Sequence, residues 1–289
     1  MSTSSIDREL DHARQSGPVR TLTIPPCPEL LTRLQAVMAE ADPDWDAVAA
    51  IASADVAMAA SLVRAANSPV YSRGRGVDNV PQAMSLLGLR QTALLLTQFL
   101  TARALPLNHP LLQTFWLGSS RRALAMGYVA RQLYGTPPDL AHTLGLFCDV
   151  GIPVMLQGLP GYAGTLVEAR ARIDRTHTLT EQLAHKTDHT IVGALVARTW
   201  GLPEDLKTAI RLHHEVEALE DRSIPEPVRV LLAATVLAEH LVHSHEGHPD
   251  APEWIQRGGD CLHHLQIHEH ELTHWQDALQ PVFEHLQAA

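Results

Sequence analysis

The stretch from Asp55 to Leu89 constrains the fold of this chain more than any other part of the sequence. Its first half spaces apolar side chains along one helical face and ends at Asn67, because Pro69 cannot continue a helix and restricts the residue before it. Its second half opens near Pro81, which suits a first helical turn. The pattern predicts two short packed helices joined by a loop, with no obvious catalytic group. The apolar positions of the first half are Met58, Leu62, Val63 and Ala66.

The composition extends this helical expectation to the whole chain. Of the 289 residues, 45% are hydrophobic, which is typical of a folded globular protein. Aromatic residues make up only 4%, while alanine and leucine are abundant. Both lose little free energy on entering a helix. We therefore predict an all-α protein.

Three further features bear on the cellular compartment. The longest apolar runs are shorter than the ~20 residues that a helix needs to cross a bilayer, so we expect no transmembrane segment. The first 20 residues lack the apolar stretch of a secretory signal. Cys27, Cys148 and Cys261 are too few and too widely spaced for a disulfide framework. These features predict a cytoplasmic protein.

The formal net charge of −10 bears on the partners of the chain. It disfavours sequence-independent attraction to the phosphates of nucleic acids or to an anionic membrane surface. We therefore expect neither nucleic acid nor membrane as a partner.

Four sequence blocks resemble one family in their order and spacing. They are the proline-rich segment Ile24-Pro25-Pro26-Cys27-Pro28-Glu29-Leu30-Leu31, the helix end from Arg64 to Tyr71 with its Ala-Asn-Ser, the block from Gln82 to Leu89 with its Leu-Leu-Gly, and Trp200-Gly201-Leu202-Pro203 ahead of His213-His214. Together they resemble the HD-related output domain (HDOD) family of bacterial signalling proteins. That family consists of degenerate relatives of the HD metal-dependent phosphohydrolases.

The resemblance implies a multi-helix bundle made of two helical subdomains. We expect a flexible arm over residues 1–20 and an HDOD-like domain over 21–217. Within that domain we expect an N-terminal subdomain at 21–105 and an HD-like subdomain at 106–217. Residues 218–289 would then form a C-terminal helical extension.

The resemblance also predicts a damaged metal site. Catalytic HD enzymes hold metal through a first histidine, a His-Asp pair, further histidines and a late aspartate. Here Gly118 stands at the first position and Cys148 replaces the histidine of the pair. The remnant set comprises Cys148, Asp149, His189, His213, His214 and Glu239.

Two interpretations of this remnant set remain open. Thiolate, imidazole and carboxylate are all zinc ligands, so the set is a candidate for a closed structural site. The preferred interpretation is that these are structural polar residues without a metal. Adjacent His213 and His214 point about 100° apart on a helix, so only one faces a shared pocket comfortably. We expect no cofactor, with a structural or adventitious divalent ion as the alternative.

The histidine-rich tail contains a second metal-like pattern. His270-Glu271-Leu272-Thr273-His274 fits HExxH, the helical zinc-protease motif. The longer continuation of the motif is missing, and a segment rich in His and Glu produces this pattern by chance. We expect no protease, although clustered histidines favour adventitious metal binding.

Three functional hypotheses follow. The first is a non-catalytic signalling module that binds a small effector or a protein in trans, such as a cyclic di-GMP enzyme or a response regulator. Its candidate groove carries Arg64, Asn67, Tyr71 and Arg90 on one side and Asp149 and His189 on the other. The second is a residual metal-dependent phosphohydrolase acting on a nucleotide or cyclic dinucleotide. The third is self-association through the C-terminal helices.

Overall fold

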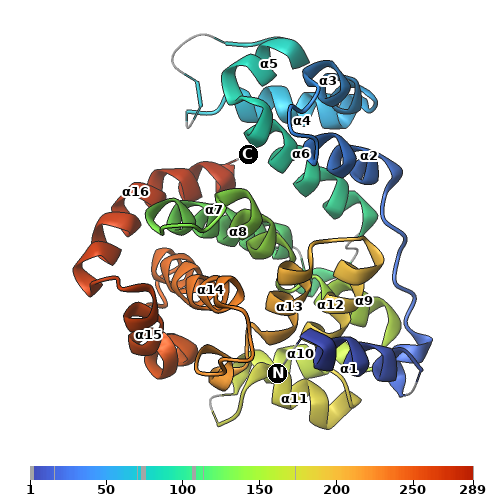
Figure 1. Ribbon diagram of the computed structural model, residues 1–289, viewed down its shortest axis with the longest axis vertical. Coiled ribbons are helices and arrows are strands. Elements are labelled where there is room, and N and C mark those ends of the chain that lie inside the picture. The colour runs from blue at the N-terminus through green and yellow to red at the C-terminus, as the bar shows by residue number, and fades with distance from the viewer. Residues whose placement is uncertain are drawn as a thin grey trace. The chain divides into compact units, whose positions relative to one another are not determined.

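The computed structural model describes residues 3–15, 17–69, 71–72, 76–105, 109–112, 114–172 and 174–288. Within these residues the protein consists of α-helices joined by turns and short 3₁₀ segments, with no β-strand (Figure 1). The all-α prediction is therefore confirmed. The chain divides into two compact units, one of Met1–Pro25 with Leu107–Leu279 and one of Pro26–Pro106 with Gln280–Ala289.

The unit of Pro26–Pro106 contains the two helices predicted from the opening pattern. Asp55 caps α4, its side chain accepting a hydrogen bond from the Met58 amide, and Asn79 caps α5 in the same way. Asn67 then holds the connecting loop, because its amide group donates to the Val77 carbonyl at 2.7 Å and accepts from the Val77 amide at 2.8 Å. The helices of this unit are α2 (Glu29–Met38), α3 (Trp45–Ser53), α4 (Val56–Ala66), α5 (Val80–Leu87) and α6 (Leu89–Ala104).

The larger unit is built around long buried helices. It contains α1 (Thr3–Gln15), α7 (Phe115–Gln132), α8 (Pro138–Phe147), α9 (Gly151–Gly158), α10 (Tyr162–Ala171), α11 (His177–His185), α12 (His189–Thr199), α13 (Glu204–Leu212), α14 (Glu226–His245) and α15 (Pro252–Leu265). The last helix, α16 (Glu269–Ala288), begins in this unit and ends in the other. Three short 3₁₀ segments, Pro18–Thr21, Pro110–Leu112 and Val216–Leu219, complete the elements.

Two glycines allow the helices of the larger unit to approach closely. A Cβ at Gly145 of α8 would lie 2.7 Å from the Ala123 Cα of α7, which is closer than van der Waals contact allows. A Cβ at Gly151, the first residue of α9, would lie 2.0 Å from the His189 carbonyl oxygen at the start of α12. Backbone therefore packs against backbone where α8 meets α7 and where α9 meets α12.

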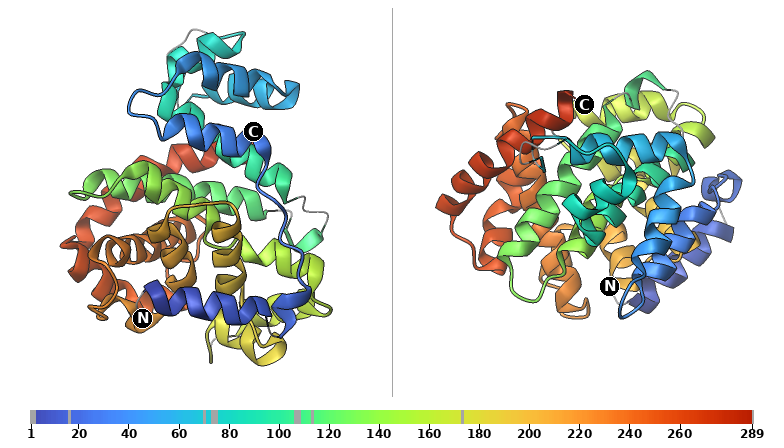
Figure 2. Two further views of the ribbon diagram at one scale, coloured as in Figure 1. Left: turned by 45° about the vertical axis from the view of Figure 1, so that its right-hand side comes forward. Right: turned by 90° about the horizontal axis from the view of Figure 1, so that it is seen from above.

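The N-terminal residues differ from the flexible arm predicted for 1–20. Thr3–Gln15 forms α1, and its Ile6 and Leu10 are fully buried. The helix packs against α12 and α13 (Figures 1 and 2). The prediction was wrong because buried residues four apart, within an otherwise polar segment, are too few to stand out as an amphipathic pattern.

One stretch meets the length and hydropathy expected of a membrane span. Pro138–Gly158, which covers α8 and α9, has a mean hydropathy of 1.3 over an 18-residue window, and 72% of that window is buried within the protein. A buried core helix passes the same test. The helix is also interrupted by the turn that carries Asp149.

Candidate functional site

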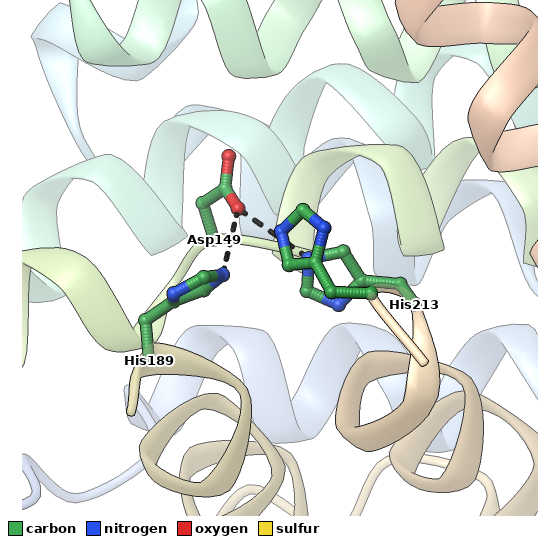
Figure 3. Close-up of side chains that lie close together, drawn as sticks. Asp149, His189 and His213 are labelled. Carbon is green, nitrogen blue, oxygen red and sulfur yellow. Dashed lines mark ion pairs between the residues drawn. The ribbon is translucent and has the colours of Figure 1, made fainter. Parts of the chain in front are cut away.

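Three side chains from three segments of the larger unit meet at one point (Figure 3). Asp149 lies in the tight turn between α8 and α9. His189 is the first residue of α12, where the Asp188 side chain accepts hydrogen bonds from the Thr190 and Ile191 amides and so fixes the helix start. His213 directly follows α13, and His214 lies beside it.

The geometry of this cluster leaves two imidazole nitrogens without a hydrogen-bond partner among the described residues. His189 Nε2 lies 3.5 Å and His213 Nε2 lies 3.6 Å from the same oxygen, Asp149 Oδ1. Both separations exceed the donor–acceptor distance of a hydrogen bond. Each Nε2 atom is buried and has no hydrogen-bond partner among the described residues, so its contact with Asp149 is an ion pair that forms when the ring is protonated (Figure 3). Two ring nitrogens therefore converge on one carboxylate oxygen without bonding to it.

The opposite ring nitrogens are firmly held. His189 Nδ1 lies 2.7 Å from Glu181 Oε2, and His213 Nδ1 lies 2.8 Å from the Ile210 carbonyl oxygen. A carbonyl oxygen only accepts, so His213 Nδ1 carries the proton and its neutral form has a lone pair on Nε2. The same tautomer follows for neutral His189 when Glu181 is ionised. Histidine ligands of metals are oriented in this way by a carbonyl or carboxylate behind the ring.

A second cluster lies behind His189. It comprises His177, Glu181 and His189, whose ligand-type atoms also come within 4.8 Å of one another. However, the Glu181 carboxylate is already used by the Tyr162 hydroxyl on one oxygen and by the backbone and ring of His189 on the other. We therefore interpret Glu181 as the group that orients His189.

His214 has its own acidic partner. Its Nδ1 lies 3.4 Å from Glu253 of α15. Arg257, which is almost fully buried, donates to Glu253 at 2.7 Å and to the His213 carbonyl at 3.1 Å. The start of α15 thus supports the backbone that carries both histidines.

Arg122 of α7 occupies the other side of Asp149. Its Nη1 donates to Asp149 Oδ2 at 2.7 Å and lies 3.5 Å from Glu239 Oε1 of α14. Its Nε donates to the Gly145 carbonyl at 2.9 Å. The side chain is only 10% exposed. The two oxygens of Asp149 therefore face different groups, the guanidinium on one side and the imidazoles on the other.

Burial and the surrounding charges shift the pKa values of Asp149 and Glu239 in opposite directions. Burial raises the pKa of Asp149, but the charge of Arg122 outweighs it, with help from His213 and His189, and holds this pKa well below its usual value. Burial raises the pKa of Glu239 to about 7, and Glu253 adds to the shift while Arg122 opposes it. Asp149 is therefore the firmly ionised acid of the cluster.

The three histidines of the cluster also differ in pKa. Burial lowers the pKa of His213 to about 4, and the neighbouring charge of His214 contributes. Burial acts on His214 in the same sense, yet the carboxylate of Glu253 raises its pKa to about 9. Burial of His189 is outweighed by Glu181, so its pKa is raised. At neutral pH His213 is therefore a free base and His214 an imidazolium paired with Glu253.

The sequence resemblance to HD enzymes implies a bound metal, and the cluster fits one divalent ion. Ligand atoms of Asp149, His189, His213 and His214 all lie within 4.8 Å of one another. Tetrahedral zinc with bonds of about 2.0–2.1 Å spaces its ligand atoms roughly 3.3 Å apart, close to the separations of 3.5 and 3.6 Å. His214 would have to lose a proton to join as a fourth ligand, and the raised pKa of His189 means that a metal would compete with a proton there as well.

The other predicted site residues fall into two groups. Cys148 is fully buried, and burial raises the pKa of its thiol, which disfavours the thiolate that a metal needs. Glu239 lies 3.5 Å from Arg122 and does not belong to the group of four residues with metal-binding geometry in the described part of the chain. Arg64, Asn67, Tyr71 and Arg90 belong to the unit of Pro26–Pro106, whereas the cluster belongs to the other unit, so a shared groove stays a prediction.

The HExxH match in the tail has a structural use. The Glu271 carboxylate accepts a hydrogen bond from the His268 amide at 2.8 Å, as in a capping box at the start of α16. His270 and His274 are exposed. Among the described residues, neither belongs to a group of three with metal-binding geometry.

Sequence reasoning missed Arg122, Glu181 and Glu253. Arg122 carried no local signal, because only the folded structure shows that it is buried beside Asp149. Glu181 follows His177 by four residues on α11, which placed both on one face. Glu253 carried none, since only the packing of α15 brings it to His214.

Comparison with known proteins places this geometry in context. Residues 24–216 match the HDOD domain family. The chain is 25% identical over 272 residues to an uncharacterized protein of Treponema pallidum (strain Nichols), covering 92% of this chain and 51% of that protein. The chain thus spans about half the length of this relative.

Solved structures share the fold. A candidate signal transduction protein from Marinobacter aquaeolei VT8 has a TM-score of 0.76 at 20% identity, covering 99% of this chain and 65% of that one. An HDOD domain protein of unknown function from Geobacter sulfurreducens has a TM-score of 0.74 at 21% identity, covering 97% and 99%. A candidate phosphohydrolase from Shewanella amazonensis SB2B has a TM-score of 0.71 at 21% identity, covering 96% of each.

Proposed function

Since the chain belongs to the HDOD domain family, we propose that it is a non-catalytic signal-transduction module of the bacterial cytoplasm. It binds a signalling protein in trans, a cyclic di-GMP enzyme or a response regulator, or a small effector. The HD-like half then serves as a folded scaffold for this binding.

The observation that carries this proposal is the ion pair between Arg122 and Asp149. A hydrolytic metal centre needs acidic ligands that are free to bind the cation. Here one oxygen of Asp149 is held by a guanidinium, which also lies 3.5 Å from Glu239. Gly118 offers no side chain, and Cys148 is a buried thiol.

A second candidate function has its own support. Asp149 with the unpartnered Nε2 atoms of His189 and His213 resembles the two-histidine, one-carboxylate ligand sets that leave coordination positions open. A divalent ion bound there would lower the pKa of a bound water. The alternative is therefore a residual phosphohydrolase acting on a nucleotide or cyclic dinucleotide.

A hydrolysis assay distinguishes the non-catalytic module from the residual phosphohydrolase. Untagged protein is loaded separately with Zn²⁺, Mn²⁺ and Mg²⁺ and assayed on bis(p-nitrophenyl) phosphate, cyclic di-GMP and nucleoside triphosphates, beside an Asp149→Asn variant. We expect no turnover that distinguishes the two proteins. Metal-dependent hydrolysis that is lost in Asp149→Asn would establish the enzyme instead.

The binding role has a separate test on the exposed arginines of the smaller unit. Arg64 and Arg90 are both exposed. A double Arg64→Ala, Arg90→Ala variant is compared with the wild type for binding to purified response regulators and cyclic di-GMP enzymes of the same bacterium. We expect at least a tenfold loss of affinity. Unchanged affinity for every partner that binds the wild type would show that these arginines are not part of the binding surface.

A further inference from the structure

Arg122 is a buried cation placed between two acidic side chains. It extends from α7 into the space between the α8–α9 turn and α14. Its Nη1 donates to Asp149 Oδ2 at 2.7 Å and lies 3.5 Å from Glu239 Oε1, while the Gly145 carbonyl fixes its Nε. These contacts leave the guanidinium little freedom to move.

This position is one that a metal ion bridging Asp149 and Glu239 would need. A cation at that point would compete with the guanidinium for Asp149 Oδ2 and would be repelled by its charge in a poorly solvated interior. Arg122 keeps its positive charge, because the guanidinium of arginine stays protonated in proteins.

The other oxygen of Asp149 has the opposite surroundings. Oδ1 faces the Nε2 atoms of His189 and His213, which have no hydrogen-bond partner among the described residues, and the His214 imidazolium beside them is paired with Glu253. One oxygen of the carboxylate thus faces a guanidinium that cannot bind metal, and the other faces imidazoles, which can exchange a proton for a metal ion.

We propose that Arg122 takes the place of a second metal ion and so restricts the cluster to one divalent cation, bound on the imidazole side of Asp149. The proposal concerns the site discussed above but does not depend on whether that site is catalytic. Metal stoichiometry is measured without substrate, so its failure is distinguishable from failure of the proposed function.

The test counts zinc ions by equilibrium dialysis and elemental mass spectrometry, with untagged protein purified without immobilised metal and stripped with a chelator. Exposed tail histidines add a background. The site-specific count is therefore the difference between each protein and the same protein carrying Asp149→Asn, because Asp149 has one oxygen on the imidazole side and the other on the arginine side. We expect a count of one for the wild type and two for Arg122→Gln.

Arg121→Gln is the matched control. Arg121 is the neighbouring buried arginine of α7, but its ion pair is with Glu246 at 2.8 Å. We expect this variant to keep a count of one. Arg122→Lys retains a positive charge and should also keep a count of one.

Several results would overturn the proposal. A wild-type count of zero or two contradicts it, as does a count of one in a folded Arg122→Gln protein. If Arg122→Gln fails to fold by circular dichroism, Glu239→Gln decides, because Glu239 lies on the arginine side. The proposal then requires that Glu239→Gln binds zinc as tightly as the wild type does. A tenfold loss of zinc affinity in Glu239→Gln would place the ion between Asp149 and Glu239 instead.

Discussion

Gly151 lies where the start of α9 crosses the start of α12, and no side chain fits there. A Cβ at this position would lie 2.0 Å from the His189 carbonyl oxygen and 2.8 Å from the Gly193 amide nitrogen. These neighbours are backbone atoms, so they move only if a helix moves. The same displacement would shift His189 relative to Asp149.

We therefore expect Gly151→Ala to lower the free energy of unfolding by about 2–3 kcal/mol, as measured by urea denaturation. Gly164→Ala on α10 is the control, because nothing lies within 4 Å of its Cβ and its φ is not positive. That substitution should be neutral or stabilise by up to about 1 kcal/mol. Equal effects of the two substitutions would contradict the close approach.

At the level of the elements, α1 links the N-terminus to the helices that carry the site. Asp7 pairs with Lys207 at 2.6 Å, and Glu9 pairs with Arg211 at 2.7 Å, two residues before His213. Arg211 Nη1 also lies 3.3 Å from the Thr190 hydroxyl, next to His189. The first helix thus contacts α12 and α13 near both site histidines.

Burial of Leu10 should contribute most to this docking. Its side chain is fully buried. We expect Leu10→Ala to cost about 2–4 kcal/mol of unfolding free energy and to speed proteolysis of α1. Asp11→Asn is the control, since Asp11, whose side chain is 61% exposed, pairs with Arg198, and exposed pairs contribute less than about 1 kcal/mol. A mobile arm would instead tolerate Leu10→Ala without loss.

For the whole molecule, acidification should reduce stability through buried histidine. His142 of α8 is 5% exposed, and burial lowers its pKa to about 4, with a smaller contribution from the charge of Arg131. The unfolded chain takes up this proton near pH 6.5, before the folded chain does. Stability from this group is therefore complete above pH 6.5 and falls as the pH decreases towards 4.

Comparing His142→Leu with the wild type isolates this contribution. Between pH 7 and pH 4 the wild type should lose about 3 kcal/mol more unfolding free energy than the variant, measured by urea denaturation at each pH. Acid sensitivity of other groups cancels in the difference. Parallel pH profiles for the two proteins would show that His142 is not held neutral.

The sequence by itself determined the helical class and the family. The alanine- and leucine-rich composition and the proline-bounded segment before Asn67 act locally, through propensity and chain breaking, so they are legible without a fold. The site residues Asp149, His189 and His213 were likewise predicted from motif order. Their convergence on one oxygen was not, because it depends on how three helices pack.

Only the tertiary structure decided the chemistry around those residues. Arg122 lies 27 positions before Asp149, and Glu253 lies 39 positions after His214, so no local pattern links either pair. Ile6 and Leu10 are two apolar residues in a polar segment until α12 and α13 provide a surface for them. Charge pairing and burial arise from contacts between distant segments, and these form only when the chain is folded.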